Sequence, residues 1–278
     1  MHYCDPKHIA KPQSLAPFLK WPGGKRWLMP EIAPFFKGEY KRYIEPFLGS
    51  GAIFFNLLPP RGILNDINSE LINTYLVVRD DWQELVLLLK EHHELHSTEY
   101  YYTIRKSNPE CMLKKAARFI YLNRTCFNGL YRVNKDGVFN VPIGTRSSVF
   151  RPTDNFELIS QTLKQADIYS TDFETVIDMA NKDDFLFVDP PYAMKQDASV
   201  FVKYNHLVFS WDDQIRLWRS VVRAKYRGCK IVLCNALNDD LASMYRETGF
   251  QIKKVNRRKV MAADGKKRDI YSELVIFG

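Results

Sequence analysis

Residues 43–56 read YIEPFLGSGAIFFN, a short apolar run that reaches Glu45 and continues through a glycine turn into a helical apolar pattern. Glycines such as Gly49 and Gly51 let the backbone approach a ligand at the start of a helix. The next apolar run, GILNDIN at residues 62–68, leads into Asp66. An acid at the end of that strand can accept hydrogen bonds from a ribose. Together the two segments predict a strand–turn–helix unit that holds a ligand at its turn.

Short apolar runs at 42–45, 62–65, 184–188 and 230–234 alternate with helical patterns. This alternation predicts a doubly wound α/β sheet with its functional residues at the carboxyl ends of the strands. A helix over 25–36 is expected to be shortened or bent by its two prolines. Two stripes with helical spacing predict a helical lobe between the halves of the sheet: Trp82, Leu85, Val86 and Leu89, and Ala116, Phe119, Ile120 and Asn123.

The chemistry of the chain is concentrated in FLFVDPPY, residues 185–192, where a buried strand runs into an acid, two prolines and a tyrosine. The Asp189 carboxylate and the Pro190 carbonyl are two adjacent oxygen acceptors, and such a pair can hold both hydrogens of an exocyclic NH2 group. Held out of plane, that nitrogen recovers its lone pair for attack. Tyr192 offers a ring on which a base can stack. An ordinary turn after a strand is the alternative interpretation.

Residues 127–142 contain the turn signals of a β-hairpin, Asn128-Gly129 and Asn134 to Gly137. A β-ribbon can enter a major groove, where arginine bonds guanine with two hydrogen bonds, and Arg132 is the best candidate for that contact. Phe127 could wedge into the base stack beside an extruded base, or it could simply pack in the core.

Six segments carry a resemblance to a known family: KWPGGK (20–25), IEPFLGSG (44–51), NDIN (65–68), NRTCFNGLYR (123–132), FNVPIG (139–144) and VDPPY (188–192). In this order the chain resembles the Dam-type DNA adenine-N6 methyltransferases, the D12 class, from Phe18 nearly to its C-terminus. The resemblance implies a Rossmann-like sheet of the S-adenosyl-L-methionine-dependent kind, with an inserted DNA-recognition lobe that carries the hairpin. It also implies methylation of a flipped adenine in double-stranded DNA, within GATC.

The motif segments assign roles to particular residues. Catalysis is expected from Asp189, Pro190, Pro191 and Tyr192. Cofactor binding is expected from Trp21, Lys25, Phe47, Gly49, Gly51, Asp66 and Asp189. DNA binding is expected from Lys20, Phe127, Asn128, Leu130, Arg132 and Pro142, and from Arg124 in the basic run 124–151. The chain departs from the family pattern at Pro22 and Tyr131.

The motifs of two other cofactor-binding sites are each contradicted by one or two residues of this sequence. A dinucleotide-binding GxGxxG would need glycine at position 54, which is Phe54. A P-loop that ends at Lys25 would need glycine at position 19 and Ser or Thr at position 26, and the chain has Leu19 and Arg26. These mismatches disfavour a dehydrogenase or an ATPase. S-adenosyl-L-methionine is the expected cofactor, and no metal is expected, because the HHELH run at 92–96 lacks an evident third ligand.

The expected reaction is a direct displacement, because the exocyclic nitrogen is itself the nucleophile and no cysteine adduct is needed. Asp189 would balance the positive charge that develops on that nitrogen. Cytosine-N4 methylation, RNA or protein-side-chain methylation, and a DNA-binding protein without catalysis remain alternatives.

The 278 residues carry 40 basic and 32 acidic side chains, which suits a polyanionic partner but also many ordinary enzymes. Basic residues are dense at 124–151 and 253–268, where either phosphate contacts or a solvated face is expected. Five cysteines without a CxxC pair suggest reduced thiols, and no apolar stretch is long enough for a membrane helix. A cytoplasmic, nucleoid-associated monomer is expected, with no membrane contact, and a cognate restriction endonuclease acting separately is possible.

The expected organisation has three parts. Residues 1–17 are expected to be a loose arm. Residues 18–80 and 166–278 are expected to form the catalytic domain, and 81–165 the target-recognition lobe with hairpin 127–142.

Overall fold

The computed structural model describes residues 15–36, 39–134, 137–192, 209–258 and 270–278. These residues form a seven-stranded sheet of order β3-β2-β1-β4-β5-β7-β6, which is parallel from β3 to β5 and antiparallel at β7 and β6. The strands are β1 Tyr43–Glu45, β2 Gly62–Asn65, β3 Ala166–Tyr169, β4 Phe185–Val188, β5 Lys230–Ala236, β6 Gln251–Arg258 and β7 Ile270–Phe277. The predicted doubly wound α/β sheet is therefore confirmed.

Strands β1, β2 and β4 are buried along their whole length, as parallel strands covered on both faces must be. This burial explains why they are legible in the sequence as continuous apolar runs. Strand β3 lies at the edge of the sheet with three of its four residues at least partly exposed, so it gives no such run and was missed. Strand β6, at the opposite edge, was missed for the same reason.

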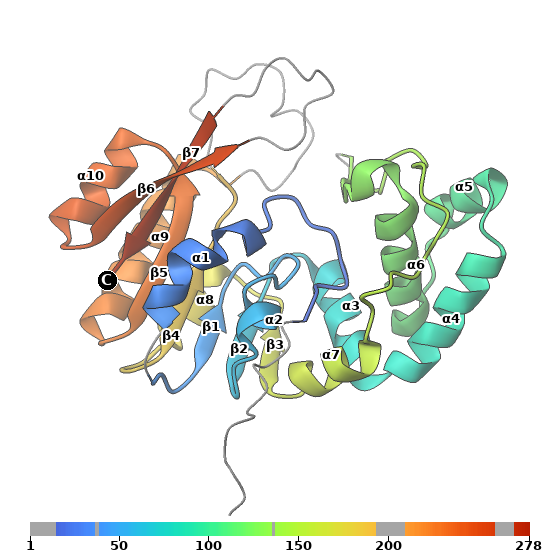
Figure 1. Ribbon diagram of the computed structural model, residues 1–278, viewed down its shortest axis with the longest axis horizontal. Coiled ribbons are helices and arrows are strands. Elements are labelled where there is room, and N and C mark those ends of the chain that lie inside the picture. The colour runs from blue at the N-terminus through green and yellow to red at the C-terminus, as the bar shows by residue number, and fades with distance from the viewer. Residues whose placement is uncertain (1–14, 37–38, 135–136, 193–208, 259–269) are drawn as a thin grey trace, which may run out of the picture.

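Alternate residues of the central strands point to opposite faces. Phe185 and Phe187 pack into one apolar cluster, whereas Leu186 and Val188 pack into the other. The second cluster is covered by three helices, which lie together beside β4 and β5 in Figure 1. They are α8 Phe173–Asp178, α9 Trp211–Tyr226 and α10 Asp239–Glu247.

The first cluster continues from the sheet into a helical part of the chain, on the right in Figure 1. Its helices are α3 Ser69–Asp80, α4 Trp82–Glu94, α5 Thr98–Lys106, α6 Met112–Thr125 and α7 Phe156–Leu163. Both predicted stripes lie on helices, with Leu85 and Leu89 buried in α4 and Phe119 and Ile120 buried in α6. Since one core runs through sheet and lobe, the division at residues 80/81 and 165/166 stays a prediction.

The segment 25–36 is broken as its prolines predict. It consists of η1 Arg26–Leu28, α1 Met29–Ile32 with proline in its first turn, and η2 Ala33–Phe36. A short helix, α2 Phe54–Leu57, follows the glycine turn. Most of the expected N-terminal arm lies outside the described residues, but Leu15 is buried and its amide donates to the Phe55 carbonyl.

The histidines of the HHELH run bond to tyrosines. Nδ1 of His92 lies 2.8 Å from the Tyr100 hydroxyl, and Nδ1 of His96 lies 2.8 Å from the Tyr121 hydroxyl. The described part of the chain contains no group of three or more potential metal-ligating side chains. A search of the same residues finds no helix with the length and apolarity to span a membrane.

Candidate active site

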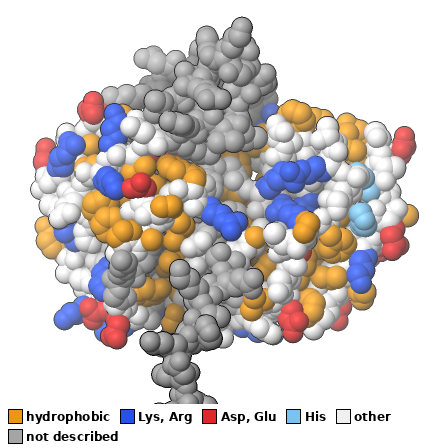
Figure 2. Space-filling view, viewed as in Figure 1, with side chains coloured by type: hydrophobic (Ala, Val, Ile, Leu, Met, Phe, Trp, Pro, Cys, Tyr) orange, Lys and Arg blue, Asp and Glu red, His pale blue; other side chains and the backbone are white. Residues whose placement is uncertain are grey.

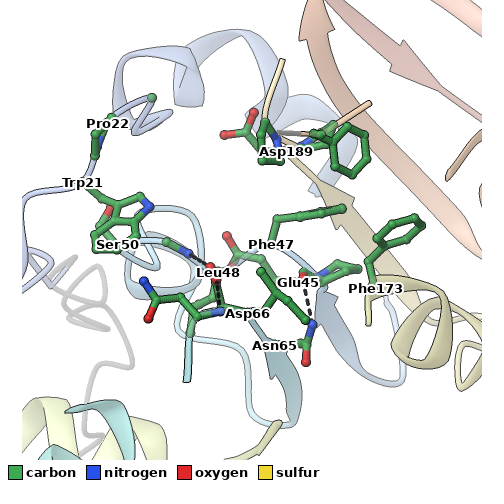
Figure 3. Close-up of a pocket in the computed structure, with 18 of the residues that line it drawn as sticks. Trp21, Pro22, Glu45, Phe47, Leu48, Ser50, Asn65, Asp66, Phe173 and Asp189 are labelled. Atoms are coloured by element: carbon green, nitrogen blue, oxygen red, sulfur yellow. Dashed lines mark hydrogen bonds between the residues drawn. The ribbon is translucent and has the colours of Figure 1, made fainter. Parts of the chain in front are cut away.

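A cavity of about 770 Å³ opens at the carboxyl ends of β1, β2 and β4, and Figure 3 shows the residues around it. The strand order reverses between β1 and β4, and ligands of open α/β sheets bind at such a switch point. The wall combines the glycine turn, the Asp66 loop, the hairpin and the DPPY segment, which are far apart in the chain. The fold thus brings the predicted catalytic and cofactor residues to one place.

Asp189 lies at the end of β4, beside a buried lysine. Its Oδ1 is 2.9 Å from Nζ of Lys25, whose side chain is only 3% exposed. The same ammonium donates to the Gly23 carbonyl and lies 3.7 Å from Glu273 Oε2. Burial raises the pKa of Asp189 to about 6, although Lys25 opposes that shift. Lys25 therefore engages one oxygen of Asp189, and among the described residues Oδ2 accepts no hydrogen bond.

Tyr192, the tyrosine of the DPPY segment, is held in place by a residue of strand β7. Its hydroxyl donates to Glu273 Oε2 over 2.9 Å, and the Lys25 ammonium lies 5.0 Å from the Tyr192 ring centroid. Glu273 stands on β7, next to β5. Neither β7 nor Glu273 was predicted, because the sequence places that acid 84 residues from Asp189 with no local signal.

The glycine turn is closed by the acid of the next strand. The Gly49 amide donates to Asp66 Oδ2 and the Asn68 amide donates to Oδ1, each over 3.0 Å. Burial raises the pKa of Asp66, and these two amides partly offset the rise. Gly49 has φ +50°, and a Cβ there would lie 2.7 Å from Cδ1 of Trp21. Position 49 therefore requires glycine both for its backbone conformation and for the close approach of the indole.

Asn65 holds the loops after three strands together. Its amide nitrogen donates to the carbonyls of Pro46 and Thr171, and its Oδ1 accepts from the Thr171 amide, all over 3.0 Å. One buried side chain thus sets the spacing between the loops that follow β1, β2 and β3. This role is invisible in the NDIN motif alone, because its partners are 19 and 106 residues away.

Three phenylalanines form one wall of the cavity, which we call the aromatic wall: Phe47, Phe173 and Phe209. The ring of Phe47 lies 5.4 Å from that of Phe173 and 5.7 Å from that of Phe209. Asp172 lines the cavity next to this wall. Phe173 and Asp172 were missed with β3, although Asp172 as a helix cap before the apolar start of α8 is a recognisable signal.

Glu45, at the end of β1, is a second buried carboxyl of the cavity wall. Its Oε2 accepts a hydrogen bond from the Tyr43 hydroxyl over 2.9 Å. Burial raises the pKa of Glu45 well above its usual range. In the sequence, Glu45 stands in the IEPFLGSG motif without a signal for a role of its own.

Four of the expected DNA-binding residues, Phe127, Asn128, Leu130 and Pro142, lie close together next to the hairpin residue Arg132, which lines the cavity. Phe127 is 53% exposed and Leu130 is 38% exposed, although both are apolar. Asn128 has φ +56°, which turns the chain sharply between them. Pro142 is exposed nearby, and its carbonyl accepts from the Phe127 amide over 2.9 Å. Phe127 is therefore exposed, which excludes the alternative that it packs in the core.

The hairpin itself is loose. Among the described residues it has two isolated bridges, Cys126–Ile143 and Val133–Phe139, instead of a continuous ladder. Arg132 is half-buried at the cavity wall, and its Nε donates to Asn140 Oδ1 over 3.1 Å. That bond fixes the guanidinium on the hairpin.

Lys20 is held against the hairpin by the lobe. The Asn123 side chain accepts from the Lys20 amide and donates to its carbonyl, over 2.9 and 2.8 Å. A Cβ at Gly129 would lie 2.3 Å from Lys20 Cδ, so the two segments are in close contact. Burial and nearby arginines lower the pKa of Lys20.

Arg124 is a correction. The sequence predicted that Arg124 lies on the DNA-facing surface, and this prediction is wrong. Its side chain is only 1% exposed and forms a bidentate ion pair with Asp154, with N–O distances of 2.5 and 2.9 Å. It also donates to the carbonyls of Val149 and Phe18. A guanidinium with these partners ties the lobe to residue 18 and cannot reach a phosphate without opening the core.

Tyr131 joins the hairpin to Trp21 and to the helical lobe. Its ring stacks on Phe119 at 4.3 Å and on Trp21 at 5.6 Å, and its hydroxyl donates to Glu70 on α3. Burial and Glu70 raise its pKa. In the sequence, Tyr131 stands out only as a departure from the family pattern.

In Figure 2 basic side chains lie near the middle of the face and also toward its left and right sides, whereas acidic ones lie mainly toward its margins. In the second basic run, Lys253 pairs with Glu31 over 2.5 Å, and residues 259–268 lie outside the described part of the chain.

Comparison with known proteins gives consistent results. The family model described as D12 class N6 adenine-specific DNA methyltransferase matches residues 21–261. The chain is 36% identical to Type II methyltransferase M1.LlaDCHI of Lactococcus lactis subsp. cremoris, over 95% of each chain. It is 37% identical to Type II methyltransferase M.MjaIII of Methanocaldococcus jannaschii, over 94% of this chain and 98% of that protein. A DNA adenine methylase of Vibrio cholerae is 32% identical, over 93% of this chain and 94% of its own length.

Proposed function

The chain belongs to the D12 class of N6 adenine-specific DNA methyltransferases, and we propose that it methylates a flipped adenine within GATC with S-adenosyl-L-methionine as the methyl donor. One observation carries this proposal. Asp189 and Pro190 stand in the wall of a cavity that also contains the glycine turn, the Asp66 loop and the hairpin. A base that enters from the hairpin side therefore reaches the acceptor pair and the cofactor loops together.

The residues of the cavity fit the cofactor. Its volume, about 770 Å³, lies within the range of small-molecule sites. Asp66 retains a lone pair on each oxygen for ribose hydroxyls, because each oxygen accepts only one backbone bond. The aromatic wall suits the flat face of the adenine, and the Asp189 carboxylate suits a cationic sulfonium. When bound, S-adenosyl-L-methionine supplies the methyl group.

The rest of the proposed mechanism uses Asp189 and the Pro190 carbonyl of the DPPY segment, together with Lys25. Lys25 engages Asp189 through Oδ1 and leaves Oδ2 to accept a hydrogen from the target amine. The Pro190 carbonyl accepts the other hydrogen, so the lone pair of the nitrogen is released from the ring. The Asp189 carboxylate then offsets the positive charge that develops on nitrogen, an effect worth several kcal/mol in preorganised sites. With a pKa of about 6, Asp189 is ionised at neutral pH, as this role requires.

The hairpin supports site recognition and base flipping. Exposed Phe127, with Asn128 after it, is placed to fill the gap left by the adenine, since an apolar side chain can take the space of an extruded base. Lys20, Leu130, Arg132 and Pro142 would read the flanking base pairs, with the arginine bonded to a guanine. GATC itself rests on the match of these residues to the Dam-type pattern.

We further propose that the enzyme acts as a monomer and that any cognate restriction endonuclease is a separate protein. Two of the relatives are named type II methyltransferases, which supports a place in a restriction-modification system. Light scattering of the purified protein, alone and with a duplex oligonucleotide, tests the monomer.

Methyl transfer to a duplex with a single GATC site tests the proposal. We expect N6-methyladenine by mass spectrometry of the digested nucleosides. Asp189→Ala should lower the rate by at least about 100-fold while DNA affinity is kept. Asp167→Ala, at an exposed acid of strand β3, serves as the matched control and should keep its activity. Product on cytosine N4, or normal turnover by Asp189→Ala, would contradict the proposal.

A further inference from the structure

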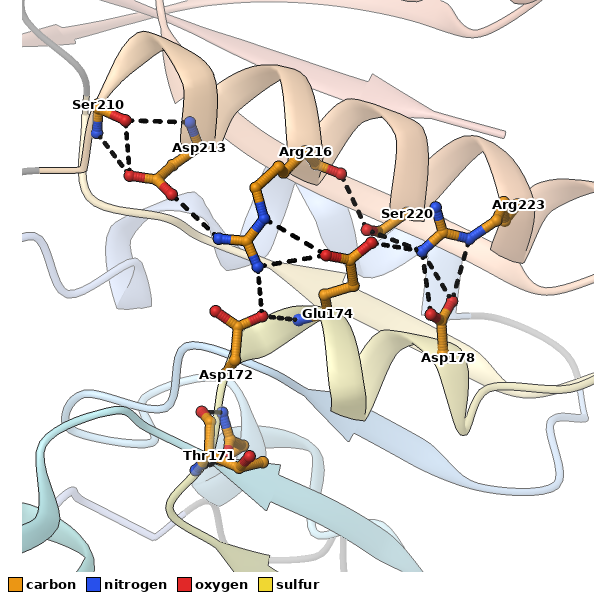
Figure 4. A network of polar contacts seen from close by, with 10 residues as sticks. Thr171, Asp172, Glu174, Asp178, Ser210, Asp213, Arg216, Ser220 and Arg223 are labelled. Carbon is orange, nitrogen blue, oxygen red and sulfur yellow. Dashed lines mark hydrogen bonds and ion pairs between the residues drawn. The ribbon is translucent and has the colours of Figure 1, made fainter.

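Two arginines of α9 reach across to α8 in an ion-pair network, shown in Figure 4. Arg216 donates to Asp172 Oδ1 over 2.8 Å and to Asp213 Oδ1 over 3.1 Å. Its guanidinium carbon also lies 4.9 Å from the centroid of the Phe173 ring. These three partners line the cavity, whereas a fourth, Glu174, which Arg216 contacts through Oε2 over 3.2 Å, does not and is shared with Arg223. Arg216 is thus the common neighbour of three cavity-wall residues.

Arg223, two turns further along α9, provides an internal comparison. It bonds Glu174 over 2.8 Å and Asp178 over 2.9 Å, and neither partner lines the cavity. The two arginines are equally exposed, 41% for Arg216 and 43% for Arg223. Both join the same two helices, but only Arg216 contacts the cavity wall.

The contacts of Asp172 define what Arg216 holds. Oδ1 accepts from the Glu174 amide over 2.9 Å as well as from Arg216. Within the described residues, Oδ2 accepts no hydrogen bond. The carboxylate is therefore held through Oδ1, which leaves Oδ2 available on a residue that lines the cavity directly before Phe173. A carboxylate oxygen next to an aromatic face is an arrangement that binds a purine with an exocyclic amine.

The second acid links Arg216 to the end of the aromatic wall. Oδ2 of Asp213 bonds the Ser210 amide and hydroxyl in a capping box, while Oδ1 bonds Arg216. Ser210 directly follows Phe209 of the aromatic wall. Arg216 therefore reaches the start of α9 and the start of α8 at the same time, which a planar guanidinium can do and a single ammonium cannot.

We infer that Arg216 is a positioning residue for the cofactor, which sets Asp172 and Phe173 for the adenine ring and selects its 6-amino group. This inference rests on the proposed use of S-adenosyl-L-methionine. According to this inference, Arg216, which lies outside the cavity, allows the site to discriminate between an adenine and a hypoxanthine ring. Arg223 has no role in positioning the adenine ring.

Isothermal titration with S-adenosylhomocysteine and S-inosylhomocysteine tests the inference. The wild type should prefer the adenosyl compound. Arg216→Ala should bind that compound roughly fivefold more weakly, as expected for loss of partly exposed ion pairs, and should lose most of the preference. Arg223→Ala should retain affinity and preference. Melting temperatures of both variants, measured without ligand, show whether the loss merely follows stability.

Each outcome bears on one claim. If the wild type binds neither compound, the proposed cofactor fails, and this inference fails with it. If the wild type prefers the adenosyl compound and Arg216→Ala keeps that preference, only the role of Arg216 fails. The same holds if Arg216→Ala and Arg223→Ala lose affinity equally. Arg216→Lys keeps the positive charge but not the planar, forked guanidinium, and it should also lose the preference for the adenosyl compound. If the lysine variant keeps the wild-type preference in full, the positioning role is overturned.

Discussion

Asp189→Asn should make the protein more stable at neutral pH while it abolishes methyl transfer. The pKa of Asp189 rises from 3.8 to about 6 in the folded protein, mainly through burial. An acid that binds its proton more tightly when folded contributes stability below pH 3.8, and that stability is lost as the pH rises to about 6. At 1.36 kcal/mol per pH unit, the ionised carboxylate costs roughly 3 kcal/mol at pH 8 and about half of that at pH 5.

The asparagine variant resembles the protonated acid and escapes this cost. Its melting temperature should therefore exceed that of the wild type at pH 8 by on the order of 5 °C, and by about half as much at pH 5. Differential scanning calorimetry at the two pH values, with no ligand, measures both differences. Methyl transfer by the same preparation should be lost, because the amide cannot balance charge on the target nitrogen.

Asp183→Asn is the control, since Asp183 is 47% exposed on a turn with φ +68°, a conformation that asparagine also adopts. It should show no pH-dependent gain. The reasoning is refuted if Asp189→Asn is no more stable than the wild type at pH 8, or gains equally at both pH values.

Three further substitutions separate structural from functional roles. Gly49→Ala should cost about 1–2 kcal/mol in backbone strain and also displace Trp21, so chemical denaturation and S-adenosylhomocysteine titration should both show losses. Gly137→Ala, with similar φ but open space around it, should show only the strain. Arg124→Ala should lower the free energy of unfolding in urea by about 3–5 kcal/mol, because it leaves Asp154 buried and unpaired, with unchanged DNA affinity of the folded protein; a loss of DNA affinity without a loss of stability would restore its predicted role. Arg132→Ala should relax preference at one base pair by about 1–3 kcal/mol in methylation assays on singly altered GATC sites, and full selectivity in the variant would argue against hairpin readout.

Much of the fold could be predicted from the sequence. The apolar runs that became β1, β2, β4 and β5 are fully or mostly buried, and burial on both faces leaves a continuous apolar signature. Edge strand β3 has a mixed pattern and left none, which also hid Asp172 and Phe173 at its carboxyl end.

The glycine turn was likewise predictable, because Gly49, Gly51 and Asp66 are close in sequence and each has a local reason for its type. The place of Arg124 was not. A basic run suggests a surface, and nothing in its neighbours indicates that Asp154, 30 residues later, neutralises it in the core.

The sequence by itself determined the strand-end motifs and the family, since both depend on residues that are neighbours in the chain. Only the tertiary structure decided the electrostatics: Lys25 beside Asp189, Glu273 behind Tyr192, and Arg216 beneath Asp172. Each of these contacts joins residues from different elements, and the pKa of Asp189 follows from its burial and its partners in space. Burial and pairing arise from packing between distant segments, which no local pattern records.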